Sequence, residues 1–164
     1  MFYKIISIVK FLWKSTNQHG VHSPFVFDFV TKGLYQKNYD LEKVNSHVEF
    51  QNLSNKKKKV LSKIINYFKI DSIYFDEKNS TNTLDKNYKI LFINNIEKLL
   101  DFNFSILKSS FFIIVKDIYQ NKETHLIWKN IIQKKEITVS IDLYFFGLIF
   151  FRKEQAKEHF KIRV

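Results

Sequence analysis

The sequence contains no cysteine, one proline and only three glycines among its 164 residues. The absence of cysteine excludes disulfides, thiolate metal sites and cysteine nucleophiles, and it fits a reducing compartment, so we expect a cytoplasmic protein. No run of about 18 uncharged apolar residues occurs, and no transmembrane helix is predicted. The apolar amino-terminal stretch carries Lys4 and Lys10 and lacks a small-residue cleavage site, so we do not expect a signal peptide.

Arginine is scarce too, although the formal net charge is +11. All but two of the 27 basic residues are lysines, the exceptions being Arg152 and Arg163. Nucleic-acid sites depend on arginine for bidentate contacts with phosphates and bases. Lys, Asn, Ile and Phe are abundant along the whole chain and Ala156 is its only alanine, which indicates compositional bias rather than a selected basic face. We therefore predict no specific nucleic-acid partner.

With 45% hydrophobic residues, the chain is long enough for one domain with a core. Short apolar runs predict strands at Asp71–Asp76, Lys89–Asn94 and Phe111–Val115. Helical patterns lie before, between and after these runs, at Lys56–Phe68, Ile96–Phe104 and Glu123–Gln133. Strands that alternate with helices indicate an α/β fold with a mostly parallel sheet.

Two β-branched and aromatic runs, Ile137–Leu143 and Phe146–Phe151, follow near the end of the chain. Gly147 lies where they meet and predicts a tight reversal, hence an antiparallel hairpin. The second run is apolar throughout, which is typical of a strand covered on both faces. The polar run 152–160 cannot continue a buried strand, so we expect the sheet to close with this hairpin.

The first 16 residues form an amphipathic helical pattern. Its apolar positions are Phe2, Ile5, Ile6, Val9, Leu12, Trp13 and Thr16. Lys4, Ser7, Lys10 and Lys14 lie largely opposite. We interpret this stretch as a helix whose apolar stripe packs on the domain, in preference to a membrane contact. The alternative is a membrane-surface anchor, which the flanking lysines and Trp13 would suit.

A loop with two histidines, His19 and His22, follows this helix. Paired histidines can bind a metal or transfer protons. No carboxylate or cysteine lies beside them at ligand spacing, so we favour a structural loop with hydrogen-bonded histidines and predict no metal site. Ser23 and Pro24 are the expected N-cap and first residue of a helix over Phe25–Leu34.

The segments Ser15–Tyr35 and Ile137–Val164 resemble a flavobacterial family of class I S-adenosylmethionine-dependent methyltransferases. The resemblance implies that the three strand runs are the first, fourth and fifth strands of that fold, and that Ile137–Phe151 is its closing antiparallel pair. The implied architecture is a truncated Rossmann-like sheet of about five strands with N-terminal helices. Residues 1–55 would be a helical segment and loop, and residues 56–164 the α/β domain.

The cofactor half of that fold is missing. The family binds its cofactor with a glycine-rich turn after the first strand, because only a bare backbone can approach the ligand closely. No glycine occurs here between Gly33 and Gly147. About a dozen residues separate Asp76 from Lys89, enough for a single crossover. This interval has no room for the family's second and third strands, which carry the acidic residue that binds the ribose.

The resemblance carries a few site residues over to this chain. Asp117 and His22 fall at catalytic positions, and Asp76, Asn94 and His19 at positions that would contact S-adenosylmethionine. The family's Asp-Gly pair after the fourth strand is Asn94-Asn95 here. An acid and a histidine can still transfer protons, but the turn that would hold the methyl donor is absent.

These departures predict a methyltransferase-like pseudoenzyme that binds no S-adenosylmethionine. One alternative is an active methyltransferase with an atypical cofactor site made by the His19–Pro24 loop and Asp117. Another is a lysine-rich module that binds a membrane surface or nucleic acid. Loss of two strands would leave the first strand at a sheet edge, and exposed edges tend to be paired. We therefore also predict a homodimer or a protein partner along Ser72–Phe75.

Overall fold

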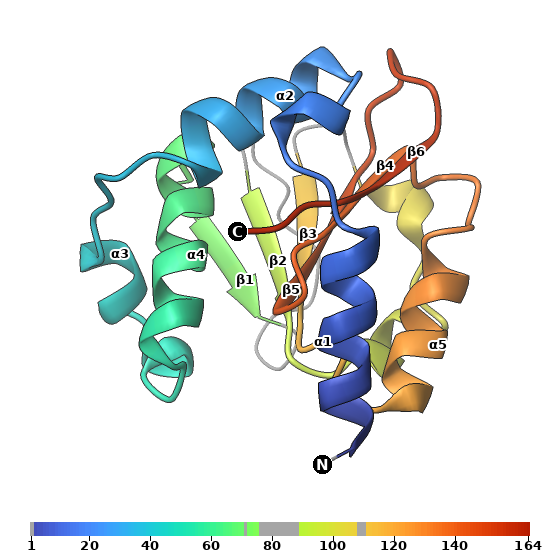
Figure 1. The fold of residues 1–164 in the computed structure, drawn as a ribbon, viewed down its shortest axis with the longest axis horizontal. Coiled ribbons are helices and arrows are strands. Elements are labelled where there is room, and N and C mark those ends of the chain that lie inside the picture. The colour runs from blue at the N-terminus through green and yellow to red at the C-terminus, as the bar shows by residue number, and fades with distance from the viewer. Residues whose placement is uncertain (1, 71, 76–88, 108–110) are drawn as a thin grey trace. The chain divides into compact units, whose positions relative to one another are not determined.

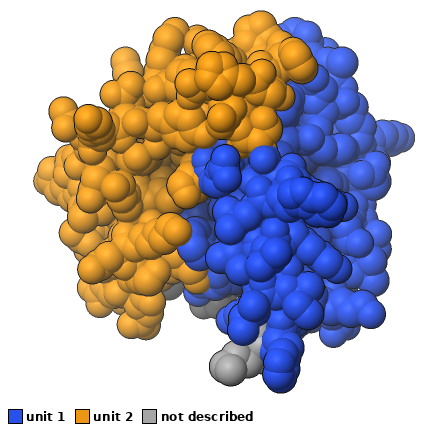
Figure 2. All heavy atoms as spheres, in the orientation of Figure 1, with its two compact units in different colours: residues 1–15, 71–163 blue, residues 16–70, 164 orange. Residues whose placement is uncertain are grey.

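A computed structural model describes residues 2–70, 72–75, 89–107 and 111–164. The chain divides into two compact units, which Figure 2 distinguishes by colour. Unit 1 comprises Met1–Ser15 and Asp71–Arg163, and unit 2 comprises Thr16–Ile70 with Val164. The first helix of the chain therefore belongs to the same unit as the sheet, whereas the helix that precedes the first strand belongs to the other unit.

The described residues of unit 1 form a mixed six-stranded sheet in the order β1-β2-β3-β5-β4-β6, which confirms the α/β class (Figure 1). The strands are β1 (Ser72–Phe75), β2 (Lys89–Ile93), β3 (Phe111–Lys116), β4 (Val139–Asp142), β5 (Phe146–Phe150) and β6 (Glu158–Lys161). The first three are parallel to one another, β5 is antiparallel to β3 and β4, and β6 is parallel to β4.

The sequence did not predict β6, because its polar residues were expected to follow the end of the sheet. The strand pairs only with β4 among the described residues, and most of its side chains are half-buried. An edge strand tolerates polar and charged side chains that a central strand excludes. The central strands β2 and β5 are buried at every position, as the apolar run in β5 predicted.

The predicted hairpin exists, but the position of its reversal was wrong. The chain turns between β4 and β5 at Tyr144, whose φ of 68° lies in the left-handed region. Gly147 lies inside β5, where a Cβ atom would come within 2.5 Å of the Trp128 ring. This glycine therefore permits close packing of the indole on the strand rather than a turn.

One face of the sheet in unit 1 is covered by α1 (Phe2–Lys14), α5 (Lys122–Ile131) and two short 3₁₀ turns, η4 (Ile96–Leu99) and η5 (Phe104–Ile106). The core there includes Leu91, Ile93, Ile113, Val115, Ile149, Phe11, Trp128 and Ile131. The predicted helix over Ile96–Phe104 was wrong. Asn95 and Asn103 each accept a hydrogen bond from a backbone N–H two residues ahead, which starts a new short turn at each place.

Helix α1 exists as predicted, but its apolar stripe does not face the core. Phe2 is 81% exposed and Trp13 87%. The buried residues of the helix are Ser7 and Phe11, on the side opposite the stripe. Phe11 packs on the rings of Tyr119 and Tyr144, with centroids 6.0 and 5.4 Å away. The expectation that the stripe packs on the domain was therefore wrong.

Unit 2 is helical, with η1 (Gln18–Gly20), α2 (Pro24–Phe29), η2 (Val30–Leu34), α3 (Glu42–Asn45), η3 (Val48–Phe50) and α4 (Asn55–Tyr67). The predicted cap is confirmed, since Ser23 Oγ accepts a hydrogen bond from the Val26 N–H at 3.4 Å. Gly33 allows η2 to approach Tyr67, because an added Cβ would lie 2.9 Å from that ring. Among the described residues, no helix is long and apolar enough to cross a membrane.

Candidate functional site

Two of the predicted site residues, Asn94 and Asp117, lie at the end of the sheet where the carboxyl ends of the parallel strands meet. They follow the parallel strands β2 and β3, and the last residues with which these two strands pair with each other are Ile93 and Val115. Asp117 is half-buried and has a left-handed φ of 54°. Its backbone N–H donates to the Phe145 carbonyl at 2.8 Å. Carboxyl ends of parallel strands are the usual place for ligands in α/β sheets, so this pair stays a candidate.

The remaining predicted residues, His19, His22 and Asp76, are not among the described residues of unit 1. His19 and His22 belong to unit 2, where both side chains are exposed. The His19 backbone N–H donates to Asn17 Oδ1 at 3.0 Å, which fixes the loop. Asp76 lies outside the described residues. Over the part of the chain that the structure covers, no group of three His, Asp or Glu side chains is arranged to hold a metal ion.

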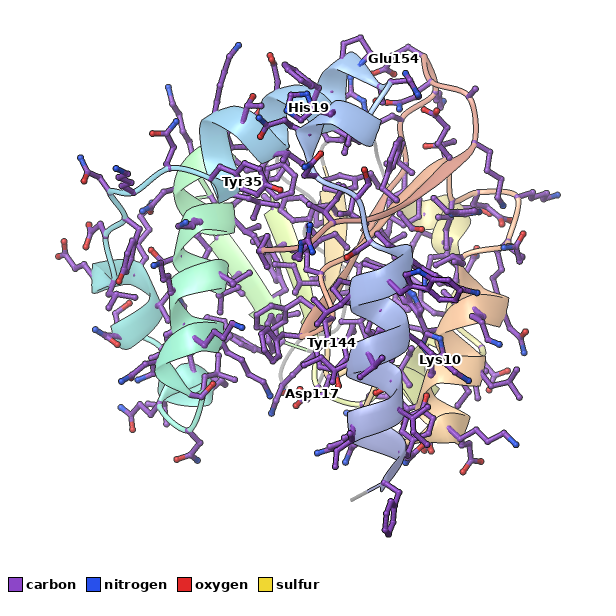
Figure 3. All side chains as sticks on the ribbon, in the orientation of Figure 1. Lys10, His19, Tyr35, Asp117, Tyr144 and Glu154 are labelled. Carbon is purple, nitrogen blue, oxygen red and sulfur yellow. The ribbon has the colours of Figure 1, made fainter. Side chains whose placement is uncertain are left out.

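Unit 1 also contains a pocket that was not predicted, of about 490 Å³, between α1 and α5. The two helices run side by side in Figure 1, and Figure 3 shows Lys10 on the side of α1 nearer to α5. The lining residues are Tyr3, Ile6, Ser7, Lys10, Phe11, Lys14, Tyr119, Lys122, His125, Leu126, Lys129 and Lys161. Five of them are lysines, and no described lining residue is acidic.

A buried carboxylate lies beneath this pocket. Asp142, at the end of β4, is 3% exposed. Its Oδ2 accepts a hydrogen bond of 2.6 Å from the Tyr119 hydroxyl and lies 3.3 Å from Lys161 Nζ. Its Oδ1 accepts from the Tyr144 backbone N–H at 2.9 Å. A buried charge is tolerated when it is paired and hydrogen-bonded in this way.

Burial sets the ionisation of the groups around this carboxylate. It raises the pKa of Asp142, against the opposing effects of the Tyr119 hydroxyl and Lys161. Burial, and next the Asp142 charge, also raises the pKa of Tyr119, so the phenol stays protonated and acts as the donor. The pKa of His125 is lowered to about 4 by burial and then by Lys161 and Lys129, while the Ile118 backbone opposes this.

The aromatic rings at the pocket wall form a stack that joins the elements of unit 1. Tyr119 stacks on His125 at 4.1 Å and on Tyr144 at 4.8 Å. The Tyr144 hydroxyl lies 3.1 Å from both Ser7 Oγ and the Lys4 carbonyl, which fastens α1 to the β4–β5 turn. In Figure 3, Tyr144 lies beside α1.

The chemistry of this pocket suits binding rather than catalysis. The Asp142 carboxylate is occupied by three hydrogen-bonding partners, and the Tyr119 hydroxyl is occupied by Asp142 and by Lys161 Nζ at 3.1 Å. His125 is neutral at pH 7 and is flanked by lysines. The cationic lining favours an anionic group such as a phosphate or carboxylate.

One signal of this cluster is present in the sequence. Asp142 is the only charged residue in the run Ile137–Phe151, and a carboxylate in a strand covered on both faces needs a buried partner. The partner was not predictable, because Lys161 comes opposite Asp142 through the register of β6, the strand that the sequence did not predict.

Comparison with known proteins gives no relative. No family model matches the chain. No curated protein and no solved structure matches it either.

Proposed function

We propose that the protein is a shortened class I methyltransferase-like pseudoenzyme of the cytoplasm that binds no S-adenosylmethionine. The observation that carries the proposal is the strand order of the sheet. A doubly wound sheet has the order 3-2-1-4-5-6, in which the first strand is central and borders the cofactor crevice. Removal of the second and third strands leaves the first at the edge, next to the fourth and fifth. The order β1-β2-β3 is the order expected after that loss.

The glycines support the proposed loss of cofactor binding. Gly33 and Gly147 both serve close packing, on Tyr67 and Trp128, and the third glycine, Gly20, lies in η1. No glycine lies in the turn directly after the strand that is matched to the family's first strand, since none occurs between Gly33 and Gly147. A backbone with side chains at that turn cannot approach the methionine and ribose of the ligand closely.

The test is titration of the purified full chain with S-adenosylmethionine and S-adenosylhomocysteine, followed by calorimetry and thermal melting. A ligand at a hundred times its Kd adds about 2.7 kcal/mol of stability. We expect no heat of binding and no melting shift up to millimolar ligand, with a cooperative melt. Saturable binding would refute the proposal. If Asp117→Ala then abolished that binding without lowering the melting temperature, the active enzyme with an atypical site would be the correct reading.

The edge position of β1 also supports the proposed protein contact. Among the described residues, β1 pairs only with β2. Three of its four residues, Ser72–Tyr74, are half-buried, and an unpaired strand edge can add a strand from another chain. We expect a dimer by light scattering at micromolar concentration, lost in Ile73→Pro, because proline removes a backbone donor. A monomeric wild type would exclude self-pairing.

A further inference from the structure

Helix α1 presents its apolar residues to solvent and its more polar side to its own unit. Ser7 and Phe11 are buried, and the Lys4 carbonyl accepts a hydrogen bond from Tyr144. The exposed apolar residues are Phe2, Ile5, Ile6, Ile8, Val9, Leu12 and Trp13. A helix that only completed a core would bury this stripe. The stripe is therefore a surface that the fold holds outward.

The charged residues of α1 itself are all basic. The helix contains no acidic residue and carries Lys4, Lys10 and Lys14. Lys10 and Lys14 also line the pocket, together with three lysines from α5 and the neighbouring elements: Lys122, Lys129 and Lys161. An apolar face beside a group of lysines is complementary to a layer that has anionic groups at its surface and an apolar interior beneath them.

We propose that α1 and the adjoining lysine pocket form a site for the surface of an anionic phospholipid bilayer. The 13-residue helix is about 20 Å long, too short to span a bilayer, so it lies in the interface plane. Its apolar stripe enters the acyl boundary with Trp13 at headgroup level. The lysines of the pocket receive the lipid phosphates, and their long stems let the ammonium groups reach the headgroups.

The same charges disfavour a second copy of the chain as the occupant. A twofold contact through the stripe would bring together two helices that each carry three lysines and no acidic residue, and like charges brought together at an interface are unfavourable. The face of one 13-residue helix is also small for a stable dimer. The proposal reverses the sequence-based preference against a membrane contact, because that preference assumed that the stripe is buried.

The experiment uses the full chain and flotation with vesicles of phosphatidylcholine alone or with about one-third phosphatidylglycerol. Trp13 is 87% exposed and Trp128 only 2%, so tryptophan fluorescence reports Trp13 entering the interface. We expect binding to the anionic vesicles that weakens with salt, with a blue shift that Trp13→Phe removes. Absence of binding to anionic vesicles at low salt would overturn the proposal.

Matched variants separate the stripe from general electrostatics. Val9 is 61% exposed and Val48, in η3 of unit 2, is 70% exposed. Val9→Glu and Val48→Glu change the net charge equally, and neither removes a buried side chain. We expect Val9→Glu to weaken vesicle binding at least about tenfold and Val48→Glu to leave it nearly unchanged. Equal effects of the two variants would overturn the proposal.

Lysine variants test the pocket. Lys10→Gln with Lys14→Gln should weaken binding to anionic vesicles about thirtyfold, because each lysine near such a surface contributes about a fivefold factor. The exposed pair Lys37→Gln with Lys153→Gln loses the same charge and should have a small effect. Equal losses for both pairs, or a dimer by light scattering that Val9→Glu dissociates, would contradict the assignment.

Discussion

Acid should destabilise the protein through His125. This side chain stacks on Tyr119 in the pocket wall, and its pKa is lowered from 6.5 to about 4 in the folded state. Between these values the unfolded chain binds a proton that the folded chain does not. Stability therefore increases with pH across this window. The contribution is fully present above about pH 6.5 and is lost as the pH falls to about 4.

The size of this effect follows from the shift in pKa. The full difference between 6.5 and about 4 corresponds to about 3.4 kcal/mol, at about 1.36 kcal/mol for each pH unit. Because the ring is only half-buried, solvent screening reduces this, and we expect about 1–2 kcal/mol. His125→Phe keeps an aromatic ring against Tyr119 and removes the titration. It also removes Nδ1, which is buried with no hydrogen-bond partner among the described residues.

The assay is urea unfolding of the wild type and His125→Phe between pH 4 and pH 7.5. The pKa of His159 is also lowered by burial, but His159 is present in both proteins, so the difference between the two curves isolates His125. We expect the variant to gain about 1–2 kcal/mol on the wild type as the pH falls from 7 to 4. His19→Phe, at an exposed position, serves as the control. Parallel curves for wild type and His125→Phe would refute the reasoning.

Two further predictions concern the packing of unit 1. Gly147→Ala places a Cβ within 2.5 Å of the Trp128 ring and should lower the free energy of unfolding by about 1–3 kcal/mol. Recovery of stability in the double variant with Trp128→Phe would identify the clash with the indole as the cause. An unchanged urea midpoint for Gly147→Ala would contradict the prediction. Tyr119→Phe removes the donor to the buried Asp142 carboxylate and should cost about 1–3 kcal/mol. Tyr39→Phe, at an exposed position, is its control, and equal urea midpoints for the two tyrosine variants would show that the Asp142 contact contributes nothing.

The sequence predicted the central sheet well, because its strands are marked by local chemistry. The apolar runs of β2, β3 and β5 are bounded by polar residues, and strands buried on both faces leave that pattern wherever they occur. Strand β6 leaves no such pattern, since an edge strand with half-buried side chains resembles a polar loop. Its pairing depends on β4, a contact that local sequence does not encode.

The pocket could not be predicted for a related reason. Asp142 was visible as a charge in an apolar run, but its partners come from the β6 register and from Tyr119, 23 residues away in sequence. The predicted residues Asn94 and Asp117 were easier to place together, because they follow adjacent parallel strands and the carboxyl ends of such strands share an edge. The structure places these two residues after adjacent strands, and their role in a site stays a prediction.

Helix α1 shows what an amphipathic pattern does and does not determine. Periodicity predicts that an apolar stripe exists, and α1 has one, but periodicity does not identify the surface that will cover it. Here Phe11 packs on the rings of Tyr119 and Tyr144, and Ser7 Oγ lies within hydrogen-bond distance of the Tyr144 hydroxyl. These contacts hold the helix with its apolar stripe facing outward. An exposed apolar surface is retained against its hydration cost when a partner removes it from water. The lysines along this surface, with no acidic residue on the helix, make an anionic bilayer the partner whose chemistry fits both halves of it.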